Sequence, residues 1–295
     1  MTIRILATRH SPFYTPIFGS IAAGFLEQEG LSGAYSVRVK GERWLTPLRE
    51  GRVEIVQNAV ASSWPEIEKG ESGLPVHFAQ LNQCDGFFLV GRREDPQFDW
   101  KKLEGRELIA DQAGQPLVML RYAAHRHGID WSKIRLLSAG EPEEMLETFR
   151  AGKGDYAHLQ APGPQQLEEQ GIGFTVAAVG DSLPSVAFNS LCSSRKFIDG
   201  RGFEPFLRAF RKAKEWACSA SPEEIAEKMA PYFPAVSNSS LAAAIGRYQK
   251  LGAWRGGVAI TRESYEQALD VYQWAGKIPR RYGYEDVCLM PPPAI

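Results

Sequence analysis

The sequence has few cysteines, the residues whose disulfides and metal bonds stabilise small domains. Its 295 residues include four cysteines, Cys84, Cys192, Cys218 and Cys288. They form no C-x-x-C pair and have no histidine nearby at metal-ligand spacing, so neither a structural zinc site nor a redox pair is expected. A chain of this length buries a core that needs no disulfide and no metal.

An excess of charge is also absent. Lysine and arginine number 34 against 35 aspartates and glutamates, which gives a formal net charge of −1. The basic residues are scattered, so nothing attracts a polyanion and nucleic acid is not an expected partner. No apolar run approaches the ~18 residues that a membrane-spanning helix requires, so we expect no membrane span.

A secretory signal is missing before the first predicted strand, residues 3–8. We expect a periplasmic protein if a leader has been trimmed, and a cytoplasmic one if Met1 is the native start. The sequence leaves both alternatives open.

What the sequence does contain is a repeated order of predicted elements. Strands are expected at residues 3–8, 35–40 and 54–58, with helices at 16–28 and 45–50 between them. The order recurs with strands at residues 107–111, 133–137 and 155–159 and helices at 116–126 and 142–152. Such alternation implies parallel strands joined by right-handed crossovers. Loops and helix N-termini then gather at the carboxyl ends of the strands, where open α/β sheets bind ligands.

Two apolar segments, residues 76–90 and 174–191, connect the two copies. Two crossings are typical of a two-strand hinge rather than of a single flexible linker. We therefore predict an α/β fold with two lobes, each a mostly parallel sheet with helices on both faces. Residues 1–90 plus 191–295 are expected to form a discontinuous first lobe, with residues 91–190 as the second lobe.

Three stretches resemble a known family: residues 11–16 (SPFYTP), 22–31 (AAGFLEQEGL) and 48–55 (LREGRVEI). They are similar to the opening of type II periplasmic binding proteins, in the branch for nitrate, sulfonate, taurine and thiamine-pyrimidine precursors. Residues 264–287 resemble that branch's last helices. The resemblance implies two lobes that close on a small-molecule ligand, no cofactor, and an ABC-transporter permease as partner. We expect a monomer.

Position in the loops after the strands selects the candidate ligand-binding residues. In the first lobe and on the first crossing they are His10, Ser11, Tyr14, Arg43, Trp44, Asn58 and Asp85, and in the second lobe Gln112, Gly114, Gln115 and Gln160. No metal ligand and no catalytic residue is among them in this interpretation.

The chemistry of these residues suits a small polar or anionic ligand. The helix that begins near Pro116 points free amide groups into the cleft, and Gly114 lets the backbone approach an anion closely. Arg43 can pair with a carboxylate or sulfonate, while Trp44 and Tyr14 can sandwich a planar group. The side-chain amides supply neutral donors and acceptors.

Structural explanations compete with these roles. Trp44 is equally suited to capping the core beneath its helix, and Arg43 to the surface. His10 is consistent with a hydrogen-bonded loop histidine, and Asp85 with a residue that stabilises the hinge.

Three functions follow from this interpretation. The leading one is a solute-binding protein that captures a sulfonate, nitrate, aromatic acid or pyrimidine-like molecule for ABC-type uptake. The alternative is a cytoplasmic lyase or hydrolase related to desulfinases, with Ser11 or Cys84 as nucleophile and His10 as general base. Desulfinases carry a cysteine where this chain has Ser11, which argues against desulfination. A metabolite sensor ranks third.

Overall fold

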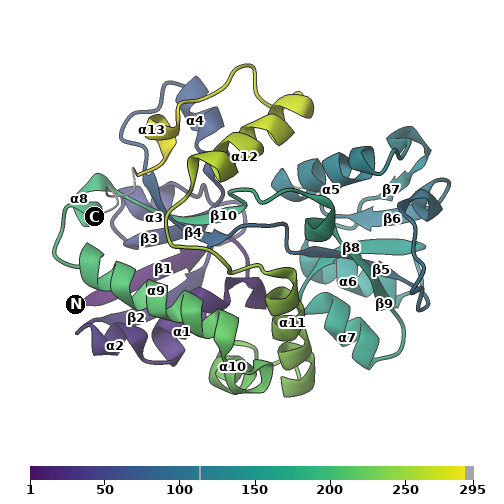
Figure 1. Cartoon of the computed structure of the whole chain (residues 1–295), viewed down its shortest axis with the longest axis horizontal. Helices are drawn as coiled ribbons and strands as arrows, with labels where there is room; N and C mark the ends of the chain where they lie inside the picture. The colour runs from purple at the N-terminus through teal and green to yellow at the C-terminus, as the bar shows by residue number, and fades with distance from the viewer. Residues whose placement is uncertain (113, 290–295) are drawn as a thin grey trace.

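The computed structural model describes residues 1–112 and 114–289, and its core is a pair of five-stranded sheets (Figure 1). The first sheet has the order β2-β1-β3-β10-β4 and is built from β1 (Thr2–Ala7), β2 (Ser32–Val37), β3 (Ile55–Asn58), β4 (Val76–Asn82) and β10 (Asn189–Ser193). The second has the order β7-β6-β8-β5-β9 and is built from β5 (Phe87–Gly91), β6 (Glu107–Ala110), β7 (Arg135–Leu137), β8 (Tyr156–Gln160) and β9 (Phe174–Ala178).

Each sheet contains one reversed strand. β10 is antiparallel to β3 and β4, and β5 is antiparallel to β8 and β9, whereas β1 and β6 are parallel to both of their neighbours. In both cases the reversed strand is the first one formed after the chain crosses from the other sheet. The predicted two-lobed α/β fold is therefore confirmed, with a mixed sheet in each lobe.

The helices cover both faces of both sheets (Figure 1). They are α1 (Thr15–Ala22), α2 (Phe25–Gln28), α3 (Thr46–Arg49), α4 (Trp64–Glu68), α5 (Gln115–Arg126), α6 (Pro142–Arg150), α7 (Gly163–Glu169), α8 (Arg195–Ile198), α9 (Phe203–Ser219), α10 (Pro222–Met229), α11 (Asn238–Leu251), α12 (Arg262–Trp274) and α13 (Tyr284–Val287). Among the described helices, none is both long enough and apolar enough to cross a bilayer.

Strand β6 shows why this layering arises. Successive side chains of a strand point to opposite faces of its sheet. Leu108 and Ala110 accordingly belong to the buried cluster that includes the apolar side of α5, while Ile109 packs with Met145 of α6 and Leu167 of α7. All three strand residues are nearly inaccessible to solvent.

The helix predicted at residues 16–28 is interrupted. α1 ends at Ala22 and α2 begins at Phe25, with Gly24 between them in the left-handed conformation at φ 77°. Glycine adopts this backbone angle without the penalty that a Cβ atom imposes. The residue therefore turns the chain where the pattern of apolar residues alone indicated a continuous helix.

The lobes are joined by two crossings, residues 83–86 and 179–188. They lie side by side, since the Val186 amide donates to the Gln83 carbonyl at 2.8 Å. The predicted boundary at residues 90 and 91 falls inside β5, which pairs within the second sheet. In the structure the chain therefore passes from the first sheet to the second a few residues before the predicted boundary, between β4 and β5.

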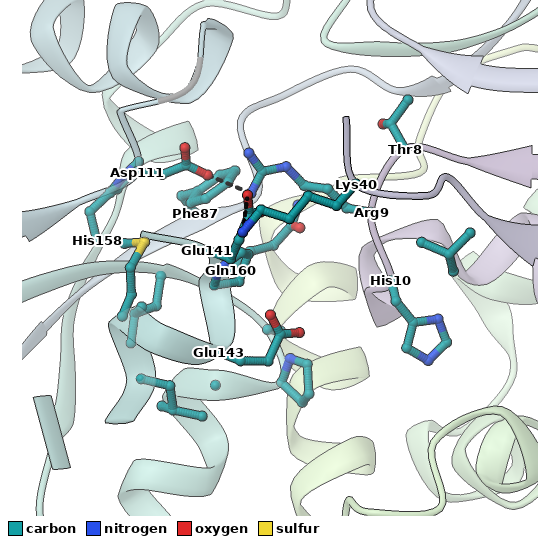
Figure 2. Close-up of a pocket in the computed structure, with 18 of the residues that line it drawn as sticks. Thr8, Arg9, His10, Lys40, Phe87, Asp111, Glu141, Glu143, His158 and Gln160 are labelled. Carbon is teal, nitrogen blue, oxygen red and sulfur yellow. Dashed lines mark ion pairs between the residues drawn. The ribbon is translucent and has the colours of Figure 1, made fainter. Parts of the chain in front are cut away.

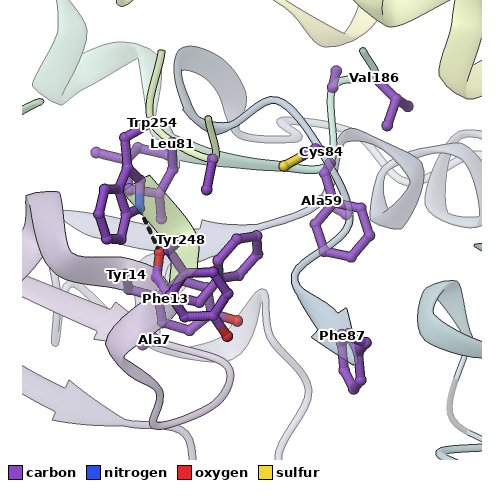
Figure 3. Close-up of a cluster of buried hydrophobic side chains, with 14 of the residues drawn as sticks. Ala7, Phe13, Tyr14, Ala59, Leu81, Cys84, Phe87, Val186, Tyr248 and Trp254 are labelled. Atoms are coloured by element: carbon purple, nitrogen blue, oxygen red, sulfur yellow. Dashed lines mark hydrogen bonds between the residues drawn. The ribbon is translucent and has the colours of Figure 1, made fainter. Parts of the chain in front are cut away.

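The loop after β1 is anchored firmly to the first lobe. Both Trp254 Nε1 and Asn82 Nδ2 donate to the Phe13 carbonyl at 2.9 Å. Figure 3 shows the rings of Phe13 and Tyr14 beside Tyr248 in a buried aromatic cluster. This packing fixes the backbone that follows Thr8, Arg9 and His10.

Candidate ligand-binding cleft

Two cavities lie between the sheets, with volumes of about 520 Å³ and 410 Å³. Thr8, Arg9, Phe87 and Gln160 line both of them. Thr8 and Arg9 follow β1 of the first sheet, whereas Phe87 and Gln160 belong to the second. The cavities are therefore two compartments of one interlobe cleft.

We call the larger compartment the charged cavity. Its lining includes three cationic residues, Arg9, Arg38 and Lys40, and three anionic residues, Asp111, Glu141 and Glu143. Figure 2 shows two ion pairs across it, Arg9 with Asp111 and Lys40 with Glu141, the second with an N–O distance of 3.6 Å. Each pair joins a residue of the first lobe to one of the second.

The Arg9–Asp111 pair occupies equivalent places in the two copies of the fold. Arg9 lies just beyond β1 and Asp111 just beyond β6. The Arg9 side chain is 25% exposed and that of Asp111 only 7%. The Arg9 guanidinium also lies 5.8 Å from the centre of the Phe87 ring. The pair is therefore largely shielded from solvent.

His158 forms part of the wall beside this pair. It lies on β8 opposite Ala110 and Leu89, and its ring stacks on that of Phe87 with centroids 4.6 Å apart. Within the described residues, neither ring nitrogen has a hydrogen-bond partner. Burial lowers the pKa of His158 to about 3, so the imidazole is neutral and offers one donor and one acceptor.

We call the smaller compartment the amide cavity. Its polar lining consists mostly of neutral groups, supplied by Thr8, Tyr14, Asn58, Ser62, Gln115, Gln160 and Asn189. Phe87, Phe188 and Tyr272 add aromatic surface. Arg9 is the one charged residue among the described side chains that line it.

Local structure orients these groups toward the cavity. The Asn58 side-chain oxygen accepts from the Ala59 amide at 2.9 Å and from Ser62 Oγ at 2.7 Å. Helix α5 begins at Gln115 without a side-chain cap, and Gly114 before it has φ 58°. The uncapped end leaves amide donors and a partial positive charge at the cavity wall.

Tyr14 also faces this compartment. Burial raises the pKa of Tyr14 to about 12, while the nearby Arg9 charge and hydrogen bonds with Gln160 and Thr8 act in the opposite direction. The phenol is therefore neutral at physiological pH and remains a hydrogen-bond donor.

The structure brings six of the eleven predicted site residues to these cavities: His10, Tyr14, Asn58, Gly114, Gln115 and Gln160. It places the other five, Ser11, Arg43, Trp44, Asp85 and Gln112, outside both linings. Whether any of these residues binds a ligand stays a prediction.

Arg43 and Trp44 lie away from the cleft because α3 packs against the outer side of the first sheet. Arg43 pairs with Glu66 at 2.8 Å and with Glu71 at 3.1 Å. Trp44 packs on the small cluster formed by Leu6, Val53, Val56 and Cys192. These positions fit the structural explanations, in which Trp44 caps the core beneath its helix and Arg43 lies at the surface.

Ser11 and Asp85 are buried behind the cleft. Ser11 Oγ donates to the Ala161 carbonyl at 2.7 Å, and Asp85 accepts from the Phe87 amide at 2.7 Å. Both side chains are at most 1% exposed. Gln112 differs from them, since it is exposed and follows Asp111 on the second lobe.

The sequence reasoning missed Arg9, Phe87, Asp111 and His158. The available signal was positional, because Arg9 and Asp111 carry opposite charges at equivalent places after the first strand of each copy. His158 and Phe87 had no such signal. Their position depends on which face of a mixed sheet turns toward the other lobe.

The residues of the enzymatic alternative are engaged elsewhere. His10 bonds through Nδ1 to the Tyr35 hydroxyl at 3.0 Å and through Nε2 to the Tyr232 carbonyl at 2.8 Å. Ser11 bonds to Ala161, and burial raises the pKa of the Cys84 thiol well above its ordinary value. An activated nucleophile needs a neighbouring base or a lowered pKa. The side chains of the described residues also form no group of three or more that could hold a metal ion.

No family model matches the chain. A protein of Bacillus subtilis (strain 168), YtlA, whose name is that of a binding protein, is 25% identical over 289 residues, covering 97% of this chain and 86% of YtlA. The ligand-binding component of an ABC-type import system from Staphylococcus aureus, solved with zinc bound, has a TM-score of 0.73 and 14% identity, with 98% and 96% of the chains covered.

A further neighbour is the periplasmic aliphatic sulphonate-binding protein SsuA from Escherichia coli. Its TM-score is 0.72 at 13% identity, and the alignment covers 95% of this chain and 94% of SsuA. The chain therefore shares its fold with these two ligand-binding proteins.

Proposed function

We propose that this protein captures a small polar organic molecule between its two lobes and passes it to the permease of an ABC-type importer. One observation carries the proposal: two adjoining cavities share a wall of Thr8, Arg9, Phe87 and Gln160, which come from both sheets. A ligand seated there contacts both lobes at once, so its binding favours their closure.

The lining supports a ligand with a charged or strongly polar head and a compact body. Volumes of about 520 Å³ and 410 Å³ fall within the range of small-molecule sites. Arg9 and the uncapped start of α5 suit an anionic group, and the aromatic rings of the amide cavity suit a planar or apolar part. A sulfonate, carboxylate or pyrimidine-like compound fits this chemistry.

The hinge of this proposal is the pair of crossings at residues 83–86 and 179–188. From the sequence, residues 1–90 with 191–295 are predicted to move as one lobe and residues 91–190 as the other. With the change of lobe at these crossings, β5 moves with the second lobe and β10 with the first. The protein would act as a monomer, since the cleft is completed within a single chain.

The test is a ligand screen by thermal denaturation, followed by calorimetry. The panel contains alkanesulfonates, aminosulfonates, nitrate, aromatic acids and pyrimidines. At a ligand concentration of 100 Kd the native state gains about 2.7 kcal/mol, which raises Tm measurably. Gln160→Ala, which alters the wall shared by both cavities, should abolish the shift. Arg43→Ala, outside both linings, should leave it intact.

Two results would contradict the proposal. One is the absence of any Tm shift across the panel. The other is a shift that Arg43→Ala removes as effectively as Gln160→Ala, since the ligand would then bind elsewhere.

A further inference from the structure

The charges around the cleft are balanced rather than biased toward one sign. Three cations face three anions around the charged cavity, and the amide cavity adds no charge beyond Arg9. His158 contributes none, because burial keeps its ring neutral. A site built for a simple anion would be expected to carry surplus positive charge.

The most shielded of these charges are already paired with each other. Arg9 bonds to Asp111 across the cleft, and the Asp111 side chain is 7% exposed (Figure 2). Arg9 lines both compartments, so a ligand that fills the cleft meets it directly. An anion that takes Arg9 leaves Asp111 without its cation. Removing one partner of a buried ion pair is strongly unfavourable because the remaining charge stays desolvated.

A ligand with both charges avoids that cost. Its anionic group replaces Asp111 on Arg9, and its ammonium group replaces Arg9 on Asp111. His158 stands beside Asp111 with both ring nitrogens unpartnered among the described atoms, which gives the ligand a further donor and acceptor. A buried polar group without a partner is unusual in a folded protein and marks a place where a ligand can supply the missing bond.

We infer, on the basis of the proposed solute-binding function, that the ligand is zwitterionic, with its anionic group on Arg9 and its ammonium group on Asp111. The amide cavity then holds the uncharged remainder of the molecule. On binding, the ligand replaces the ion pair between Arg9 and Asp111. Asp111 is thus a specificity-determining residue that selects against compounds with the anion alone.

The experiment compares matched probes that differ by the ammonium group. Taurine is paired with ethanesulfonate, and β-alanine with propanoate. Calorimetry on the wild-type chain should give a Kd for the zwitterion lower by roughly 100-fold than that of its partner, the discrimination expected when a buried carboxylate gains or loses its cation.

The variant Asp111→Asn removes the charge and keeps the shape. It should weaken binding of the zwitterion. It should strengthen binding of the simple anion, because that anion then no longer leaves a buried carboxylate without its cation. The preference should shrink to under about 3-fold, a change of selectivity that a merely structural role would not produce. Glu147→Gln is the control for the loss of a negative charge. Its side chain is 68% exposed on α6 and lies outside both linings, so the preference should stay near its wild-type value.

The outcomes separate this inference from the proposed function. Equal binding of either probe and its partner by the wild type overturns the zwitterion assignment. Binding of an anionic or neutral panel compound, but of neither zwitterion, overturns it as well and leaves the solute-binding function standing. No binding by any compound overturns both.

Discussion

The two lobes meet in the cleft and again along a second junction, and the two are built differently. In the cleft the lobes are linked by single ion pairs around cavities, Arg9 with Asp111 and Lys40 with Glu141. The second junction, which we call the seam, is formed by the end of α7 and by α11. There Glu169 accepts hydrogen bonds from three serine hydroxyls, Ser237, Ser239 and Ser240, at 2.8–2.9 Å.

The difference separates recognition from closure. The cleft pairs face space that a ligand can enter, so a ligand can replace them. At the seam Arg247 reaches both carboxylate oxygens of Glu168 at 2.8 Å, and Glu169 meets the start of α11 directly. Under the proposed function, these bonds would form when the lobes close around any ligand. The cleft should therefore set which ligand binds, and the seam how long the closed state lasts.

The crossing at residues 83–86, between the two junctions, provides the largest test of this division between recognition and closure. Asp85 is fully buried there, and burial raises its pKa to about 8 from an ordinary 3.8. The folded chain therefore holds a proton that the unfolded chain releases. The resulting stability is complete below pH ~4 and is lost as pH rises toward 8. Asp85→Asn mimics the protonated form and should stabilise the protein by up to about 5 kcal/mol near pH 8.

Urea denaturation from pH 4 to pH 8 measures this effect. The wild-type free energy of unfolding should fall with pH more steeply than that of the variant. Asp199→Asn, an exposed position, serves as control and should leave the pH dependence as in wild type. Ligand affinity should be unchanged in Asp85→Asn. A large change in affinity would show that the crossing takes part in recognition, which would break the distinction.

The features that sequence could predict are local ones. The strand and helix order of both copies follows from apolar periodicity and from Gly and Pro positions, and it already places the loops of His10, Asn58 and Gln115 together. Periodicity is blind to strand direction, so the reversal of β5 and β10 could not be predicted from it. The pairing of Arg9 with Asp111 depends on how the two sheets face each other, which no local pattern encodes. Trp44 was ambiguous for the same reason.

Tyr248 links the two junctions and should give the next largest effect. It lies on α11, and its buried hydroxyl donates to the Gly86 carbonyl at 3.0 Å and accepts from the Ala161 amide at 3.2 Å. Tyr248→Phe leaves both backbone groups buried without this partner, at a cost of about 2 kcal/mol. Chemical denaturation should show the loss, and calorimetry should show weaker binding of every ligand by a similar factor.

Tyr122→Phe is the control for the loss of a hydroxyl group. It keeps the ring that packs against Trp274 with centroids 5.0 Å apart, and it should change stability by less than about 0.5 kcal/mol. If Tyr248→Phe weakened one ligand and spared another, Tyr248 would belong to recognition rather than to the coupling between the junctions.

The smallest expected effect comes from the seam itself. Glu169→Gln removes a negative charge that three serine hydroxyls and the N-terminus of α11 stabilise. These hydroxyls lower the pKa of Glu169 below its ordinary 4.5, so its contribution is complete above that pH and is lost as pH falls through the lowered value. At pH 7 the variant should release ligand on the order of 3-fold faster in stopped-flow experiments. Glu147→Gln, an exposed change on α6, should not accelerate ligand release.

The rank order of ligands should be the same in both variants, because the charges that distinguish ligands lie in the cleft. A changed rank order of ligand affinities in Glu169→Gln would mean that the seam also contributes to ligand selectivity. Closure and recognition would then be a single property of the interface.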